Sequence, residues 1–190
     1  MNMSQSLRGL FLVAGCRLRD PHFFKSAVLI VEHGAEGAMG MIVNRPTPDT
    51  LWKTLNEHLE VPSTQDLIYY GGPVESEALF LVHDCGEMDP DECAIVPGVY
   101  MGSSQEVFEN VVCPNRPKPA GLKYRVYRGC SSWGPGQLEG ELARGDWLLL
   151  PAQADYVFHS DPYAVWDELM RHCFRQGRVL PTTCEHPEWN

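Results

Sequence analysis

The sequence lacks positive charge over a long central stretch. Residues 61–115 hold ten carboxylates and neither lysine nor arginine, whereas residues 1–60 and 116–190 each balance acidic against basic side chains. The net charge of −10 therefore arises in this stretch alone. Because binding to a phosphate backbone requires clustered lysine and arginine, the composition argues against direct contact with nucleic acid.

Long hydrophobic runs and closely paired cysteines are also missing. No apolar segment approaches the roughly 18 residues that a membrane-spanning helix needs, and the seven cysteines contain no CxxC pair. An odd number of cysteines in a chain of this length is typical of reduced thiols. We therefore expect a cytoplasmic protein with no membrane segment, no metal site and no cofactor.

The sequence does contain the hydrophobic residues of one folded domain. With 190 residues, 44% of them hydrophobic, the chain is long enough to bury a core without the support of disulfides. No internal repeat or low-complexity segment divides it. We predict a single domain over residues 1–177, followed by a C-terminal tail over residues 178–190.

Short apolar runs alternate with helical patterns along the chain. The apolar runs predict strands at residues 10–14, 27–31, 39–43, 67–70, 78–83, 99–101, 122–126 and 147–150. The spacing of leucine and valine, together with capping residues, predicts helices that begin near residues 51, 107, 135 and 162. The expected fold is α+β, with a mixed or antiparallel sheet and about four flanking helices.

Arg45 is the side chain that we would test first for binding an anionic ligand. A hairpin between the second and third predicted strands places His33 near the turn and Arg45 at the far edge. Guanidinium groups bind carboxylates and phosphates through paired N–H groups, although an internal salt bridge is the alternative. The densest cationic cluster is predicted to lie along one face of a strand; it comprises Lys123, Arg125 and Arg128.

A hydrolase is one alternative function. Cys130, Ser131 and Ser132 lie where a strand meets the turn into a helix, and a helix N-terminus offers N–H groups to an oxyanion. His83, followed by Asp84, supplies a candidate base. The GxSxG motif is absent, however, and serine before a helix is also a common cap. The hydrolase hypothesis requires a histidine within about 3.2 Å of the nucleophile.

A protein-interaction module is the second alternative. Five carboxylates fall within nine residues, at Asp84, Glu87, Asp89, Asp91 and Glu92. Such oxygen ligands bind divalent cations, but the EF-hand spacing is absent, which favours a solvated loop. This loop, residues 84–92, would then act by attracting a basic partner.

Motifs spread over residues 7–175 resemble those of the AlgH/YqgE family of bacterial proteins. The motifs that carry the resemblance include Glu32-His33, Asn44-Arg45-Pro46, Gly71-Gly72-Pro73-Val74 and Trp133-Gly134-Pro135-Gly136-Gln137. The resemblance implies a sheet that curls into a partial barrel. Some members are labelled transcriptional regulators because of a link to alginate production, and that label implies no direct contact with DNA.

We predict a non-enzymatic domain that binds a ligand or a protein and regulates indirectly. Its partner is expected to be a small anionic ligand or another protein, and the sequence leaves the oligomeric state open. The predicted binding residues match the family motifs, lie at the ends of predicted elements and are expected to line one pocket. They are His33, Asn44, Arg45, Gly71, Gly72, Pro73, Trp133, Gly134, Gly136 and Gln137.

Overall fold

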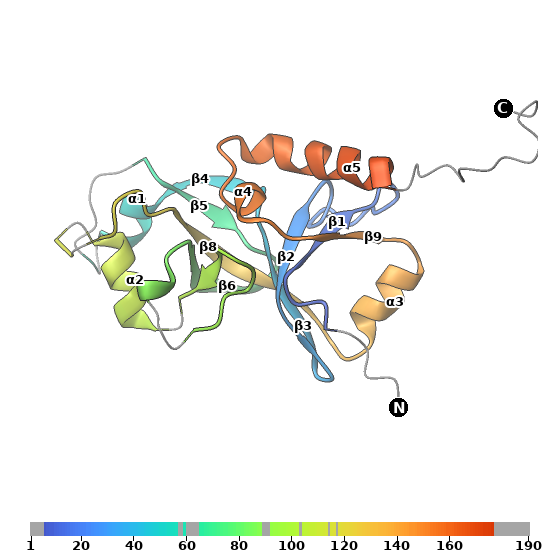
Figure 1. The fold of residues 1–190 in the computed structure, drawn as a ribbon, viewed down its shortest axis with the longest axis horizontal. Helices are drawn as coiled ribbons and strands as arrows, with labels where there is room; N and C mark the ends of the chain where they lie inside the picture. Colours follow the sequence, from blue (N-terminus) through green and yellow to red (C-terminus); the bar gives the residue numbers. More distant parts are fainter. Residues whose placement is uncertain are drawn as a thin grey trace, which may run out of the picture.

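A nine-stranded mixed sheet forms the centre of the structure (Figure 1). The structure is a computed structural model that describes residues 6–56, 59, 65–88, 92–102, 104–113, 115–116 and 118–176. Its strands are β1 (Leu10–Ala14), β2 (Ala27–Gly34), β3 (Gly37–Ile42), β4 (Pro46–Thr50), β5 (Leu67–Tyr70), β6 (Val74–His83), β7 (Tyr100–Met101), β8 (Tyr124–Trp133) and β9 (Trp147–Pro151). The predicted α+β fold is confirmed.

The strand order brings the first strand next to the last. The path runs β4-β5-β8-β3-β2-β1-β9, and β6 pairs with both β8 and β7. β5 and β8 are parallel, whereas the other pairs of described strands are antiparallel. Because the path ends at β4 and β9, the sheet stays open and does not close into a barrel.

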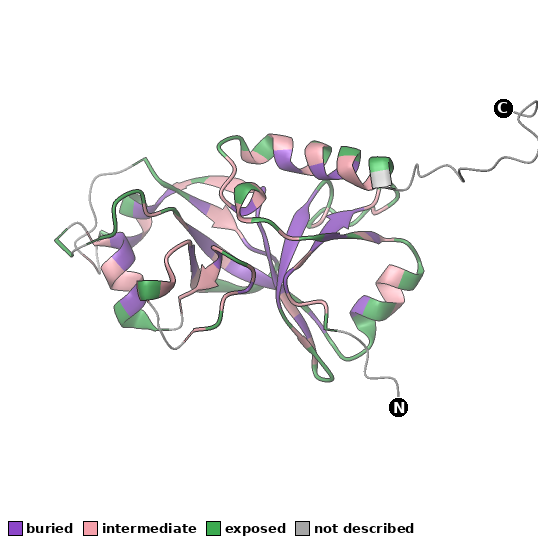
Figure 2. Ribbon diagram, in the orientation of Figure 1, coloured by how far each residue is buried: buried purple, intermediate pink, exposed green. Residues whose placement is uncertain are grey.

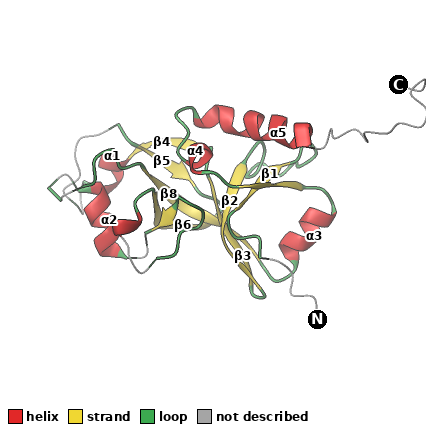
Figure 3. Cartoon of the chain, in the orientation of Figure 1, coloured by secondary structure: helices red, strands yellow, loops and turns green. Residues whose placement is uncertain are grey.

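Helices pack around this sheet (Figure 3). The helical segments are α1 (Leu51–Leu55), α2 (Gln105–Val112), α3 (Gln137–Ala143), α4 (Ala154–Val157), α5 (Val165–Gln176) and two 3-10 turns, Gly86–Met88 and Pro162–Ala164. Thr50 and Ser104 cap α1 and α2, since each side chain accepts a hydrogen bond from the backbone N–H three residues later. α1, α2, α3 and α5 are the four predicted helices, and α4 adds a single turn.

β1 and β2 are buried on both faces over most of their length (Figure 2), which explains their continuous apolar runs. One face presents Phe11 and Leu29 to a core that includes Leu169 of α5. The opposite face presents Leu12 to a second core that includes Leu138 of α3. A third core joins α1 and α2 to β5, β6 and β8.

β8 joins two parts of the sheet, which lie on either side of Gly129. Residues 124–128 pair with β5 and β6, whereas residues 131–133 pair with β3. Gly129 has a φ of +70°, a conformation that favours glycine. The chain at Gly71 passes so close that a Cβ there would lie 2.1 Å from the carbonyl oxygen of Gly129. Glycine at both positions therefore allows the two parts of the sheet to meet.

The structure corrects the sequence prediction at β4 and on β8. No strand is predicted at β4, because two of its five residues are prolines. Proline is tolerated there because β4 is an edge strand that pairs with β5. Lys123 precedes β8, and the two cations on this strand do not share one face: Arg125 contacts the backbone at Val43, whereas Arg128 pairs with Asp49. The physical reason is the two-residue period of a strand, which turns positions 125 and 128 to opposite sides.

The described residues bear on three further predictions. The predicted tail, residues 178–190, lies outside them. Within the described part of the chain, no helix combines the length and the apolar character that a bilayer crossing requires. The six cysteines that the structure describes are free thiols.

Candidate functional site

The predicted site residues fall into two groups at opposite ends of β3. At the turn end, His33 pairs with Ala38, and Ala38 pairs in turn with Trp133 of β8. At the other end, the N–H of Ile42 donates to the carbonyl of Gly71, and the chain continues into Asn44 and Arg45. The predicted hairpin geometry, with His33 near the turn and Arg45 at the far edge, is confirmed.

The turn end of the β2–β3 hairpin forms a hollow with a volume of about 510 Å³, which we call the hairpin hollow. Its lining comprises residues 32–39 with Ser132 and Trp133. Gly134, Gly136 and Gln137 follow Trp133 into α3, which lies beside the β2–β3 hairpin (Figure 1). This half of the predicted site is therefore brought together in space. The expectation that the ten predicted residues line one pocket is wrong, because His33 and Trp133 line the hollow whereas Arg45 and Gly71 lie at the other end of β3.

His33 is held in one orientation by two hydrogen bonds. Its Nδ1 accepts the backbone N–H of Leu7 at 3.2 Å, so Nε2 carries the proton in the neutral ring. Nε2 then donates to a carboxylate oxygen of Glu139 at 3.0 Å. The side chain of His33 is only 4% exposed. Both ring nitrogens thus serve to tie the hairpin to the N-terminal segment and to α3.

Glu141 organises the wall behind the hollow. One of its carboxylate oxygens accepts the indole N–H groups of both Trp133 and Trp147, each at 2.8 Å. Its other oxygen accepts the side-chain amide of Gln137, whose own oxygen accepts the N–H of Gly134. Sequence reasoning missed Glu139 and Glu141, although their position on the helix after the Gly-Pro-Gly turn was the available signal.

Arg45 and Asn44 hold the loop that precedes β2. The two terminal nitrogens of Arg45 donate to the carbonyls of His22 and Phe24, and the guanidinium lies over the ring of Tyr70. Burial lowers the pKa of Arg45, and the neighbouring Tyr70 partly opposes this effect. Two terminal nitrogens of Arg45 are thus engaged by backbone carbonyls, and the ion pairs of the described residues do not include Arg45. Its binding of an anion stays a prediction.

Replacing Asn44 with alanine is expected to lower the free energy of unfolding by about 1–3 kcal/mol. Asn44 accepts the N–H of Ala27 at 2.8 Å and donates to the carbonyl of Lys25 at 2.9 Å, so the alanine leaves a buried donor unsatisfied. Urea unfolding should show a lower midpoint with an unchanged slope. Ser132→Ala, at an exposed position, is the control and should change stability by less than about 0.5 kcal/mol. Equal midpoints for both variants would contradict the expected role of Asn44.

The turn Gly71-Gly72-Pro73 makes backbone contacts with β8. The N–H of Gly71 donates to the carbonyl of Arg128, and the Gly71 carbonyl accepts both the N–H of Ile42 and the hydroxyl of Ser131. A Cβ on Gly72 would lie 2.3 Å from the carbonyl group of Cys130. Gly71 and Gly72 are buried, whereas Pro73 is exposed. The structure gives these glycines a packing role, and ligand binding by this turn stays a prediction.

The residues of the hydrolase hypothesis are committed to the fold. Burial raises the pKa of the Cys130 thiol, and the nearby Glu75 raises it further, which opposes formation of a thiolate. The Ser131 hydroxyl donates to the Gly71 carbonyl at 3.0 Å. The candidate base, His83, is fully buried at the end of β6, where it lies opposite Tyr124, whereas Cys130 lies six residues further along β8, opposite Val74. These contacts provide no activated nucleophile at Cys130 or Ser131.

The acidic loop is described only in part. Asp84 accepts the N–H of Lys123 through its side chain, and its own N–H donates to the Lys123 carbonyl. Asp84 therefore fastens the end of β6 to the start of β8. Glu87 lies in the 3-10 turn Gly86–Met88, and Asp89 and Asp91 lie outside the described residues. A partner-binding role for residues 84–92 stays a prediction.

Comparison with known proteins shows which family the chain is similar to. The family model DUF179, described as AlgH-like, matches residues 11–176. The chain belongs to the AlgH-like family. The resemblance that the motifs indicate over residues 7–175 is confirmed.

Relatives in the AlgH-like family match nearly the whole chain. A UPF0301 protein of Cereibacter sphaeroides is 33% identical over 185 residues, which cover 95% of this chain and 98% of the relative. A UPF0301 protein of Anaeromyxobacter sp. strain K is 37% identical over 171 residues, 85% of each chain. The solution structure of AlgH from Pseudomonas aeruginosa aligns with a TM-score of 0.72 at 27% identity, over 97% of this chain and 99% of that one. A crystal structure from Corynebacterium diphtheriae shares the fold over 90% of each chain, with a TM-score of 0.70 at 22% identity.

Proposed function

We propose that this AlgH-like protein is a non-enzymatic binding domain that receives a short basic segment of a partner protein in the hairpin hollow. The observation that carries the proposal is the hollow itself, which unites His33 and Trp133 from distant parts of the sequence. Two hydrogen bonds fix His33, and Glu141 fixes Trp133. A pre-formed surface of this kind binds at a lower entropic cost than a mobile one.

The lining of the hollow favours a lysine or arginine side chain flanked by apolar groups. Glu32 and Glu36 line it as exposed carboxylates, and Ala35 and Met39 add apolar surface. A long basic side chain packs its stem against apolar surface while its charged head meets a carboxylate. The lining therefore matches the chemistry of a basic peptide better than that of an anion.

Regulation through a protein partner agrees with the charge of the chain. A net charge of −10 disfavours binding to operator DNA. We therefore infer that regulation by this protein acts through binding to another protein. The free thiols of the described residues accord with action in the cytoplasm.

Titration of the isotope-labelled protein with an acetylated Leu-Arg-Leu tripeptide amide tests the proposal. We expect saturable amide shifts at residues 32–39 and around Trp133. The double variant Glu32→Lys and Glu36→Lys should weaken binding at least about ten-fold, because it reverses both charges in the hollow. Glu77→Lys, at an exposed position on β6 outside the hollow, is a single-site control for charge reversal and should bind as the wild type does. Shifts elsewhere, or equal binding by all three proteins, would falsify the proposal.

A further inference from the structure

A second cavity lies where the parallel strands β5 and β8 begin. Its volume is about 320 Å³, at the lower end of the range for small-molecule sites. The charged groups in its lining are Asp66, Lys123 and Arg125, and the aromatic ones are Tyr69, Tyr124 and Phe158. Leucine and valine side chains complete it. We call it the β5–β8 cavity.

Arg125 is a buried cation that lacks a carboxylate partner among the described residues. It is 7% exposed, and the ion pairs of the described residues do not include it. Its terminal nitrogens donate to the carbonyls of Val43, at 2.8 Å, and His159. Those two bonds use two of the five N–H groups that a guanidinium carries. A buried charge is costly when no opposite charge offsets it.

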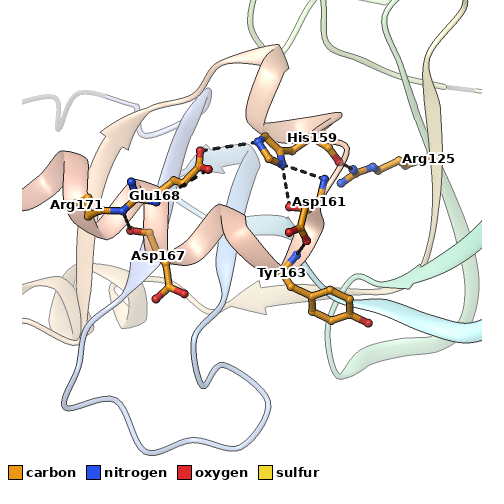
Figure 4. Close-up of polar contacts among 7 residues, drawn as sticks. All are labelled: Arg125, His159, Asp161, Tyr163, Asp167, Glu168 and Arg171. Atoms are coloured by element: carbon orange, nitrogen blue, oxygen red, sulfur yellow. Dashed lines mark hydrogen bonds and ion pairs between the residues drawn. The ribbon is translucent and has the colours of Figure 1, made fainter.

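Carboxylates near this region are engaged by other groups. Figure 4 shows Arg125 reaching the backbone of His159, while Glu168 faces the His159 ring and Arg171. The Asp161 side chain accepts the N–H of Tyr163. Neither carboxylate supplies the counter-charge to Arg125.

The guanidinium end of Arg125 lies at the β5–β8 cavity. The ring centre of Tyr69 is 4.3 Å from the guanidinium carbon, and Tyr69 lines the cavity. Phe158, which also lines it, directly precedes the carbonyl that accepts from Arg125. Lys123 is exposed and stands at the same cavity. Two cations and three aromatic rings therefore line one cavity.

The charge of the lining defines the class of ligand. Asp66 accepts a hydrogen bond from the hydroxyl of Tyr124 at 2.8 Å. The lining of the cavity carries one negative charge, on Asp66, and two positive charges, on Lys123 and Arg125, so its net charge is +1. A tyrosine phenol is uncharged at neutral pH, and burial raises the pKa of Tyr69 further. A ligand with a single negative charge neutralises the lining of the cavity, whereas a ligand with two negative charges would be repelled by the carboxylate of Asp66.

We propose that the β5–β8 cavity binds a small organic monocarboxylate with an aromatic or apolar body. The carboxylate pairs with the guanidinium of Arg125 and the ammonium of Lys123, and the body packs among the rings and aliphatic side chains. This site is separate from the hairpin hollow and takes a ligand of the opposite charge. The proposal thus assigns to Arg125 the anion-binding role that the sequence suggested for Arg45.

Titration with benzoate, followed by amide shifts and thermal stability, tests the proposal. We expect saturable shifts at Leu67 and Phe158 and a higher melting temperature. Benzamide, the uncharged analogue, should bind at least about ten-fold more weakly, because hydrogen bonds to charged groups are the stronger ones. Equal responses to benzoate and benzamide, or no saturable response to benzoate, would overturn the proposal.

Variants on β8 separate ligand binding from a structural role. Arg125→Met should lower the affinity for benzoate at least about ten-fold. Arg128→Met, on the same strand but paired with Asp49 outside the cavity, should bind as the wild type does. If Arg125→Met fails to fold, Lys123→Met serves instead, because the side chain of Lys123 is exposed, and we expect a loss of affinity of about two- to five-fold. Unchanged affinity in Lys123→Met and in any folded Arg125→Met would reject the site.

Discussion

Glu141→Ala is expected to lower the free energy of unfolding by about 2–5 kcal/mol, because it leaves two indole N–H groups without an acceptor. Trp133 and Trp147 are both 3% exposed, and both donate to the same oxygen of Glu141. Water has little access to replace that oxygen, so each donor bears much of its desolvation cost. Urea unfolding followed by tryptophan fluorescence should show a lower midpoint with an unchanged slope.

Glu141→Gln is the matched control for this prediction. Its amide oxygen can still accept from the indoles, whereas its amide NH₂ replaces the oxygen that accepts from Gln137. We expect less than half of the destabilisation that alanine causes. An equal loss in both variants would mean that the carboxylate charge stabilises the fold more than the two indole hydrogen bonds do.

Gly71→Ala should cost more than about 4 kcal/mol and deplete the folded protein. The added methyl carbon would lie 2.1 Å from the Gly129 carbonyl oxygen and 3.2 Å from the sulfur of Met41. The first contact is with backbone, so relief requires β8 to move away from the chain at Gly71. That movement would break the hydrogen bond from Ser131 to the Gly71 carbonyl. Circular dichroism during heating should show a large fall in melting temperature.

Gly34→Ala isolates the steric effect from the general cost of replacing glycine. At Gly34, the last residue of β2, an added Cβ would meet no heavy atom within 4 Å. Neither Gly34 nor Gly71 has a positive φ, so neither substitution forces a side chain into the left-handed region. We expect Gly34→Ala to stay within about 1 kcal/mol of the wild type. Comparable losses in the two variants would contradict the crossing of strands as the cause.

The strands that sequence reasoning located best are those with continuous apolar runs. β1 and β5 begin and end where these runs predict, at residues 10–14 and 67–70. In β1 this run reflects burial, since four of its five residues are buried, whereas in β5 only Ile68 is buried and the run reflects strand propensity. β4 was missed because its prolines are allowed only by its place at the sheet edge. That place is a property of the whole topology, which the local sequence does not contain.

The candidate site was predictable to the extent that it depends on neighbours along the chain. The hairpin brings His33 beside Ala38, as the turn between the two strands predicts. The partners of Arg45 and Arg125 are backbone carbonyls from loops far along the chain. Such acceptors leave no trace in residue type, because every residue carries a carbonyl. The sequence therefore identified cations but did not reveal which of them lines a cavity.

Because β1 pairs with β9, this part of the sheet cannot be completed until the ribosome has synthesised β9. Leu10 lies opposite Pro151 and Ala14 opposite Trp147, so one edge of β1 has no partner until β9 has been made. At about 5–20 residues per second, that interval is on the order of ten seconds. An apolar strand with an open edge is prone to pair with other chains. We therefore expect nascent chains that end before β9 to depend on chaperones, and the need to disappear once residue 151 has emerged from the ribosome.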